Sequence, residues 1–365
     1  MPKVHPLVSV ILTSFNHERF IREAIESVLG QTFSNFELII LDDASSDDSW
    51  GIIQSYDDPR ILAYRNPENL GPTYGVNKAI FELVQGKYIA IHHSDDVWEL
   101  NKLQKQVDFL ESNKNIGAVF SNALSIDELG SPLRDKEHLY FNIFNQPNRS
   151  RHEWLRFFFT HGNALCHPSV LVRKSCYENC GPYRQELAQL PDFDMWIRLC
   201  SNYEIHVMSE KLVRFRILDN ERNSSGSRPE VRIRATYELL KVTPNYLRHG
   251  SFDDLVKTFP VIKNYCHGGS ADIKFLFALA ALEEETHKST KLFAQDIIFD
   301  AISDPVRAKN IKKLYNFDYR NLIEITGKND IFSQNEVFSL QRTLADLDVQ
   351  IANINQVVAD RDVQI

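Results

Sequence analysis

An apolar segment of this chain ends abruptly in two adjacent carboxylates, Asp95 and Asp96. Residues 88–91 before them, Tyr-Ile-Ala-Ile, are types that pack well inside a sheet. Open α/β sheets bind ligands at the carboxyl ends of their strands, so such a strand delivers both carboxylates to the binding edge. Adjacent carboxylates repel each other unless a cation or hydrogen bonds offset their charge, and Mg²⁺ prefers one or two carboxylates plus substrate phosphates. We therefore predict a divalent metal at Asp95 and Asp96.

A second apolar segment, residues 36–41, also ends in an acidic pair, Asp42 and Asp43. Two parallel strands with acidic ends point to one polar crevice. Either pair can instead cap the helix that follows, because anions suit a helix N-terminus. For Asp42 and Asp43, a capping role and a role in a functional site are equally supported. For Asp95 and Asp96, metal binding is favoured over capping.

Strand-like and helix-like segments alternate through the first third of the chain, and this alternation predicts a mainly parallel sheet with right-handed crossovers. A further strand at residues 116–121 extends the sheet beyond the acidic site. The predicted strands are residues 7–12, 37–41, 61–64 and 88–91, and the predicted helices are residues 18–29, from 46, 73–84 and 101–110.

The net charge and the cysteine content exclude several classes of protein for this chain. The formal net charge of −8 argues against a general nucleic-acid-binding surface. Five cysteines without C-x-x-C spacing indicate neither a disulfide framework nor a zinc site, and reduced thiols favour the cytoplasm. No apolar run approaches the ~20 residues that cross a bilayer. We predict a cytoplasmic protein, with peripheral attachment at the inner membrane left open.

Two later segments have open interpretations. Residues 191–199 predict a helix with Asp192 in its exposed first turn, where a carboxylate is either a helix cap or a positioned base. The aromatic segment at residues 154–159 either covers a cleft or packs a helix onto the core, and packing is the more common role of an aromatic stripe.

Several of these segments, in this order, resemble the inverting nucleotide-sugar glycosyltransferases of family 2, which have the GT-A fold. The resemblance spans roughly residues 6–225 and implies a Rossmann-like mixed, mainly parallel sheet. The matching segments are residues 8–16 (VSVILTSFN), 31–33 (QTF), 42–47 (DDASSD), 95–96 (DD) and 192–196 (DFDMW).

The resemblance implies roles for individual residues in binding the donor. Thr13 and Phe15 would line the pocket for the nucleotide base, and Asp43 would hydrogen-bond the base, most often uracil. Asp95 and Asp96 would hold Mg²⁺ or Mn²⁺ against the donor diphosphate, so that Asp95 is also part of the nucleotide site.

Catalysis and the basic partner of the diphosphate are implied in the same way. Asp192 matches the base that deprotonates the acceptor hydroxyl, and Arg216 would pair with the diphosphate, since guanidinium binds phosphate bidentately. The chain departs from the family at His93, which stands where the common D-x-D-D pattern has its first aspartate. The third metal ligand is therefore left unassigned.

The implied function is metal-dependent, inverting transfer of a sugar from a nucleotide donor, a UDP-sugar, to a hydroxyl of a glycan or lipid-linked glycan in bacterial surface polysaccharide synthesis. One alternative is a nucleotidyltransferase, which should carry a glycine-rich basic phosphate loop after the first strand, where this chain has Thr-Ser-Phe-Asn at residues 13–16. Another is a catalytically silent scaffold, against which the retention of Asp43, Asp95, Asp96 and Asp192 argues.

The C-terminal third has a different character. We predict a transferase domain at residues 1–228, a helical appendage at 229–332 and a coiled coil at 333–365. Apolar residues repeat at alternating spacings of three and four in the last segment, and a dimer or trimer of identical chains is expected through it. A lone amphipathic helix is the alternative. The pattern has no terminal breaker, so we expect the coiled coil to continue in a longer native protein. The seam is Val337, Leu340, Leu344, Leu347, Ile351, Ile354 and Val358, followed by Arg361 and Ile365.

Overall fold

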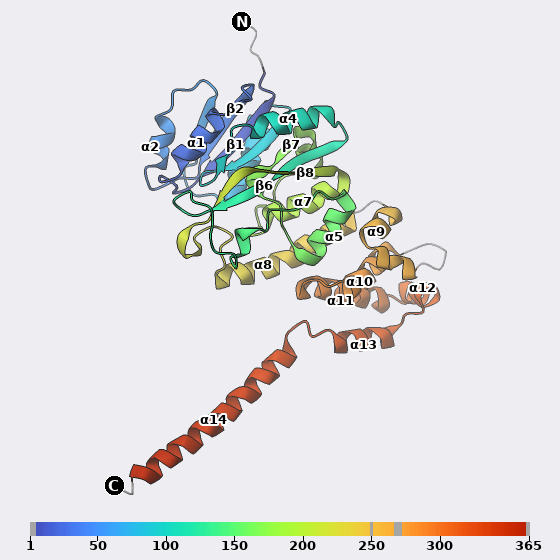
Figure 1. The fold of residues 1–365 in the computed structure, drawn as a ribbon. Helices are drawn as coiled ribbons and strands as arrows, with labels where there is room; N and C mark the ends of the chain where they lie inside the picture. Colours follow the sequence, from blue (N-terminus) through green and yellow to red (C-terminus); the bar gives the residue numbers. More distant parts are fainter. Residues whose placement is uncertain (1–4, 249–250, 266–271, 363–365) are drawn as a thin grey trace. The chain divides into compact units, whose positions relative to one another are not determined.

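The structure is a computed structural model that describes residues 5–248, 251–265 and 272–362. The chain divides into two compact units, one ending at Pro260 and the other beginning at Val261 (Figure 1). The first unit contains a mixed sheet flanked by helices, and the second contains helices only within its described residues.

The first unit is built on an eight-stranded sheet with the strand order β3-β2-β1-β4-β7-β6-β8-β5. Neighbours are parallel from β3 to β4 and between β6 and β8, whereas β7 is antiparallel to both of its neighbours and β5 is antiparallel to β8. The predicted mixed, mainly parallel sheet is confirmed. The strands are β1 (Val8–Ser14), β2 (Phe36–Asp42), β3 (Ile61–Arg65), β4 (Tyr88–His93), β5 (Val97–Trp98), β6 (Ile116–Ile126), β7 (Leu171–Arg173) and β8 (Glu204–Arg216).

Strands β5 and β8 escaped the sequence analysis for physical reasons. β5 is only two residues long. In β8, exposed residues 209–211 interrupt the apolar pattern, where the register against β6 shifts near Asn122. A bulged strand loses the strict alternation on which sequence recognition depends.

The register of the central strands brings the predicted site residues to one edge of the sheet. Thr13 of β1 lies opposite Leu41 of β2 on one side and opposite His93 of β4 on the other. The acidic ends of β2 and β4 therefore flank the end of β1, as parallel pairing requires.

One face of the sheet packs against α1 (Ile21–Leu29), α2 (Ser49–Gln54) and α4 (Lys102–Ser112) in a single apolar core. Val8, Val10 and Leu12 of β1 belong to this core, and the intervening residues face the other side of the sheet, because side chains alternate along a strand. On that other side, α7 (Pro191–Asn202) packs Trp196 edge-on against Phe120 of β6, with ring centroids 4.8 Å apart.

The aromatic helix is α5 (Arg151–His161), and its rings pack inside the unit. Trp154 and Phe158 are buried, and Phe158 lies edge-to-face with Phe193 of α7 at 5.7 Å. This arrangement agrees with the packing interpretation of the aromatic stripe.

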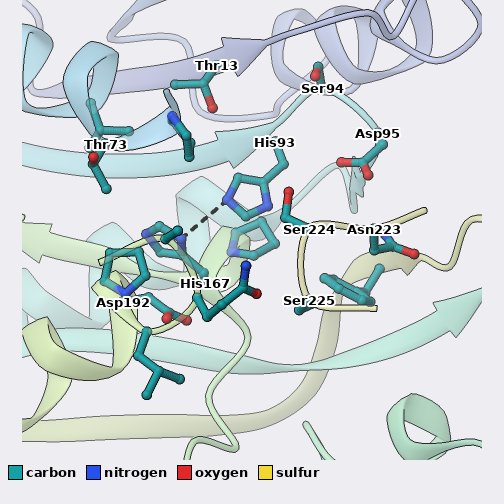
Figure 2. A pocket seen from close by; sticks show the side chains of 18 of the residues that line it. Thr13, Thr73, His93, Ser94, Asp95, His167, Asp192, Asn223, Ser224 and Ser225 are labelled. Carbon is teal, nitrogen blue, oxygen red and sulfur yellow. Dashed lines mark hydrogen bonds between the residues drawn. The ribbon is translucent and has the colours of Figure 1, made fainter. Parts of the chain in front are cut away.

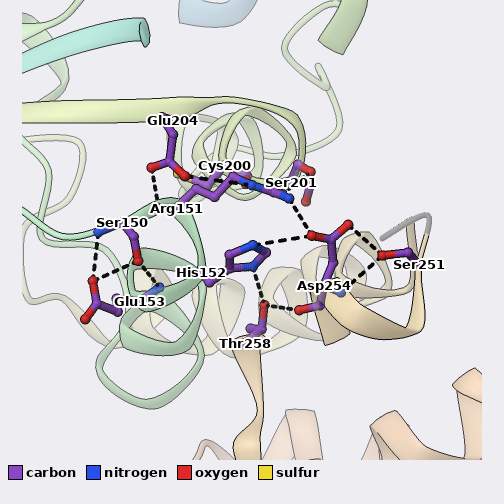
Figure 3. Close-up of polar contacts among 10 residues, drawn as sticks. All are labelled: Ser150, Arg151, His152, Glu153, Cys200, Ser201, Glu204, Ser251, Asp254 and Thr258. Carbon is purple, nitrogen blue, oxygen red and sulfur yellow. Dashed lines mark hydrogen bonds and ion pairs between the residues drawn. The ribbon is translucent and has the colours of Figure 1, made fainter. Parts of the chain in front are cut away.

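The first unit continues past the expected domain boundary at residue 228 and includes α8 (Pro229–Val242) and α9 (Phe252–Thr258). Figure 3 shows how α9 is fastened to α5: Asp254 pairs with Arg151 at 2.5 Å and with His152 at 3.3 Å. His152 also contacts the Thr258 hydroxyl at 3.2 Å. Burial and the neighbouring Arg151 lower the pKa of His152, so the ring is neutral at pH 7.

The second unit consists of α10 (Ile273–Glu283), α11 (Lys288–Ser303), α12 (Pro305–Tyr315), α13 (Tyr319–Lys328) and α14 (Gln334–Asp362). Its core includes Phe275 and Phe277 of α10, and Phe275 stacks on Tyr315 of α12. In α14 the described apolar seam residues from Val337 to Ile354 are exposed. The seam positions Val358, Arg361 and Ile365 lie outside the residues whose side chains are described. Among the described residues, no helix has the length and apolar character needed to span a membrane.

Candidate active site

A cavity of about 680 Å³ lies where β1, β2 and β4 end. Five of the predicted site residues line this cavity, namely Thr13, Phe15, Asp43, Asp95 and Asp192. A volume of this size is typical of sites for small organic ligands. Figure 2 shows Thr13, His93, Asp95 and Asp192 around it.

The loops after β1 and β2 are tied together beside this cavity. Asn16 and Ala44 both have positive φ, +53° and +60°, and these backbone turns bring the two loops side by side. The Asn16 side-chain oxygen accepts a hydrogen bond from the Ser46 backbone N–H at 2.8 Å, and the Asn16 backbone N–H donates to the Ser45 hydroxyl at 3.0 Å. The rim near Phe15 is therefore fixed, whereas the Phe15 ring itself is 43% exposed and free to contact a ligand.

Asp43 organises the wall of the cavity next to Thr13. Its Oδ1 accepts hydrogen bonds from the Asn66 side chain at 2.8 Å and from the Leu70 amide at 2.9 Å. Its Oδ2 accepts from the Gly71 amide at 2.9 Å. Gly71 has φ of +83°, which a residue with a Cβ rarely adopts, so the glycine permits this close turn. Each carboxylate oxygen can accept more than one hydrogen bond, so Asp43 can still contact a ligand.

His93, Asp95 and Asp96 form a cluster whose donor atoms all lie within 4.8 Å of one another. The sequence left His93 unassigned, and the structure places its ring beside both carboxylates. Asp96 is 1% exposed, and its buried Oδ2 accepts no hydrogen bond from the described residues, with His93 Nδ1 3.5 Å away. An unsatisfied buried carboxylate oxygen together with an imidazole and a second carboxylate is a donor set that fits Mn²⁺ or Mg²⁺.

The protonation of this cluster reflects its mutual charges. Burial raises the pKa of Asp95, and the negative charge of Asp96 raises it further. Burial lowers the pKa of His93, but the contact with Asp96 at 3.5 Å and the negative charges of Asp96, Asp95 and Asp192 together raise it overall. The cluster therefore favours bound positive charge, either a proton or a cation.

Arg216 does not reach the cavity, so the prediction that it pairs with a donor diphosphate does not fit the structure. Its side chain is 2% exposed, and Nε donates to the Asp95 carbonyl at 2.7 Å. The two other nitrogens donate to the carbonyls of Asp127 and Glu128 and to the Glu23 carboxylate. The Arg216 amide donates to Asp96 Oδ1 at 2.8 Å. Arg216 thus holds the loop that carries Asp95 and Asp96, here called the acidic loop, and does not face a ligand.

The cation that does line the cavity is Arg222, in the loop after β8 together with Asn223, Ser224 and Ser225. Arg222 is paired with Glu128, which also pairs with Arg19. Arg222 was not predicted from the sequence, because an arginine's exposure cannot be read from its neighbours in sequence.

A chain of hydrogen bonds runs from His93 into the protein. His93 Nε2 lies 3.3 Å from His167 Nδ1, and His167 Nε2 lies 3.1 Å from the Tyr183 hydroxyl (Figure 2 shows the first contact). The Tyr183 hydroxyl in turn lies 3.0 Å from that of Tyr177. Burial lowers the pKa of His167 well below its usual value, so this ring is neutral. The chain fixes the orientation of His93 with Nδ1 toward Asp96.

Asp192 lies in the first turn of α7 and lines the same cavity. Its Oδ2 accepts from the Asn163 side chain at 2.8 Å, and its Oδ1 accepts from the Phe193 amide at 2.7 Å. Burial raises the pKa of Asp192 in spite of these two hydrogen bonds. A carboxylate with a raised pKa is a stronger base than an ordinary aspartate. The neighbouring Asp194 is fully buried among Arg184, Arg198 and Asn245 and has a structural role.

Comparison with known proteins identifies the family. A sequence model described as glycosyl transferase family 2 matches residues 9–173. An uncharacterized glycosyltransferase of Methanocaldococcus jannaschii is 32% identical over 217 residues, which cover 58% of this chain and 71% of the relative. The chain belongs to glycosyltransferase family 2. Because the chain is a glycosyltransferase, the two alternative functions, a nucleotidyltransferase and a catalytically silent scaffold, are not favoured.

A further relative and a similar solved structure carry more specific names. The Escherichia coli protein WfaP, a UDP-Glc:alpha-D-GlcNAc-diphosphoundecaprenol beta-1,3-glucosyltransferase, is 27% identical over 230 residues, covering 60% of this chain and 84% of WfaP. The crystal structure of S. aureus TarS 1–349 in complex with UDP-GlcNAc matches with a TM-score of 0.56 at 14% identity, covering 85% of this chain and 91% of TarS. This structural likeness confirms the GT-A fold.

Proposed function

We propose that this glycosyltransferase transfers a sugar from a UDP-sugar to a glycan or lipid-linked glycan hydroxyl, with inversion, during bacterial surface polysaccharide synthesis. The observation that carries the proposal is the single cavity lined by Asp43, Asp95 and Asp192, because it offers contacts for a base, a diphosphate and an acceptor. The name of the relative WfaP supports UDP as the nucleotide and a lipid-linked glycan as the acceptor.

In this proposal Asp192 removes the proton of the acceptor hydroxyl. The hydroxyl oxygen forms the new bond to the anomeric carbon, and the bond from that carbon to the diphosphate breaks, its electron pair leaving with the nucleotide. Attack comes from the side opposite the leaving group, so the anomeric configuration inverts. Asn163 keeps the Asp192 carboxylate oriented, since it donates to one of its two oxygens.

His93, Asp95 and Asp96 would hold Mn²⁺ or Mg²⁺, with Thr13, Phe15 and Asp43 on the side of the nucleotide base. A bound cation stabilises the negative charge that develops on the leaving diphosphate. Arg222 replaces Arg216 as the proposed cationic partner of the diphosphate, because Arg222 lines the cavity. A cytoplasmic location is supported by the four described cysteines, none of which forms a disulfide.

Calorimetric titration with UDP and GDP, each with and without Mn²⁺, tests the donor assignment. We expect UDP to bind with Mn²⁺ at least about tenfold more tightly than without it, which corresponds to ~1.4 kcal/mol. Tighter binding of GDP would replace the uracil assignment. No binding of either nucleotide in the presence of Mn²⁺ would contradict the proposed donor class.

We also propose that α14 pairs with α14 of a second copy of the chain. The exposed apolar side chains of its described part lie at alternating spacings of three and four, the seam of a coiled coil. In a parallel pair, the residues that flank the seam place Glu336 opposite Gln341 and Thr343 opposite Asp348, so like charges do not meet.

Leu347→Asp should shift the protein toward a monomer, because a charge in the middle of the seam cannot be buried without a partner. Light scattering after size-exclusion chromatography measures the mass. Val349→Asp is the matched control, since Val349 lies outside the seam and is also exposed in one chain, at 60% against 46% for Leu347. A parent protein that is already monomeric, or equal masses for the two variants, would refute the pairing.

A further inference from the structure

Helix α8 faces the active site with one side. Its buried residues Val231, Glu238 and Val242 recur at helical spacing, which places them on one face. Val231 and Ala235 line the cavity together with Leu190 from the segment before α7. The helix that the sequence assigned to an appendage is therefore part of the cavity wall.

Glu238 is a buried carboxylate that binds the backbone directly ahead of Asp192. The residue is 2% exposed. Its Oε1 accepts from the Ala188 amide at 2.8 Å, and its Oε2 accepts from the amides of Gln189 and Leu190, each at 2.8 Å. Hydrogen bonds to an ionised carboxylate are stronger than neutral ones, and together these three offset the cost of burying the charge.

The segment held by Glu238 leads into the first turn of α7. Leu190 precedes that helix, Pro191 opens it and Asp192 follows. Pro191 has no N–H, so the three amides that Glu238 binds are the last backbone N–H donors before Asp192. On the other side of Asp192, the buried Asp194 accepts a hydrogen bond from Asn245 at 2.6 Å, in the segment after α8. Asp192 is thus held between two anchors that both involve α8 or the turn after it.

We infer that Glu238 is a positioning residue for Asp192, and that α8 belongs to the acceptor side of the active site. This inference rests on the proposed role of Asp192 as the base. A carboxylate held in one place keeps the base aligned with the acceptor hydroxyl, and misplacement of about 1 Å is enough to lower a rate by ~100-fold.

Glu238→Gln tests this role. The Gln side chain has one acceptor oxygen, and its NH₂ group would face a backbone N–H, so the segment before α7 has to shift. Glu230→Gln is the matched control, because Glu230 is exposed on the same helix and pairs only with Arg228 among the described contacts. Glu238→Asp keeps the charge but is shorter, and it separates loss of charge from loss of position. Thermal unfolding establishes that each variant is folded.

Two readouts decide the inference. Mn²⁺-dependent release of UDP from UDP-glucose and UDP-N-acetylglucosamine, with water replacing the acceptor, should slow by about 10- to 100-fold in Glu238→Gln, with UDP affinity unchanged. Carbon-13 NMR of labelled aspartate, assigned with Asp192→Asn, should show the pKa of Asp192 falling toward ~3.9 as the side chain becomes more solvated. Glu230→Gln should match the parent in both.

The outcomes separate the inference from the proposed function. If Glu238→Gln and Glu238→Asp both leave the pKa of Asp192 and the release rate at the parent values, Glu238 does not position the base. If Asp192→Asn releases UDP as fast as the parent, the proposed role of Asp192 fails, whatever Glu238→Gln does. If the parent releases UDP from neither donor, the titration with UDP and GDP decides the proposed donor class, and the NMR titration decides the role of Glu238.

Discussion

Asp192→Asn should reduce sugar transfer by about 10³-fold while leaving Mn²⁺-dependent UDP binding unchanged, since a positioned general base typically contributes 10²- to 10⁴-fold. The amide keeps the size of the side chain, and its single oxygen can replace one of the two carboxylate oxygens that accept from Asn163 and from the Phe193 amide. It has no oxygen with appreciable basicity. The rate of UDP release and calorimetric titration with UDP measure the two effects.

The pH dependence of the parent gives an independent check on the same residue. Asp192 accepts a proton only when it is ionised, so the rate should rise with pH as Asp192 deprotonates. Burial raises the pKa of Asp192, and this acidic limb should therefore lie above the ~3.9 of an ordinary aspartate. A rate that is flat across the limb, or a variant as active as the parent, would remove Asp192 from the reaction.

Asp95→Ala should abolish most of the gain in UDP affinity that Mn²⁺ provides, a loss of at least about tenfold or ~1.4 kcal/mol. The substitution leaves the Asp95 carbonyl in place, so the hydrogen bond from Arg216 that secures the loop remains. It also removes one of two neighbouring negative charges, and the melting temperature without metal should be unchanged or higher.

Asp135→Ala is the control for Asp95→Ala, because Asp135 is exposed and lies outside the cavity lining. Calorimetry with and without Mn²⁺ should show the parent response in this control. A full Mn²⁺ response in Asp95→Ala would exclude Asp95 from metal binding. A large fall in melting temperature would instead identify Asp95 as a structural residue.

The central strands were predictable because their residues are β-branched and apolar in short runs, and the acidic residues that end β2 and β4 followed from parallel pairing. The sequence also indicated Asp192 at the start of a helix. These features depend on short stretches of sequence, in which apolar residues are buried and the acidic residues lie at the ends of the strands.

The errors concern residues whose role depends on distant partners. Arg216 and Arg222 are equally charged in the sequence, yet only the first is enclosed by Glu23, Asp127 and Glu128, more than 85 residues away in sequence. Glu238 is similar, because a glutamate on an amphipathic helix is ordinarily solvated and its partners lie about 50 residues earlier. The composition change after Arg228 likewise gave no sign that α8 belongs to the same compact unit as the sheet.

The Arg216 contacts also set the order in which this site can form during synthesis. Asp96 lies 120 residues ahead of the backbone amide that holds it, and β5, directly after the acidic pair, is bonded in the sheet only to β8. A growing chain can pair β1, β2, β3 and β4 early, but contacts of long sequence separation must wait until both partners have emerged. The loop that carries Asp95 and Asp96 is therefore secured only once β8 has left the ribosome, so a nascent chain released before that point would carry a sheet core in which this loop is not yet held in place.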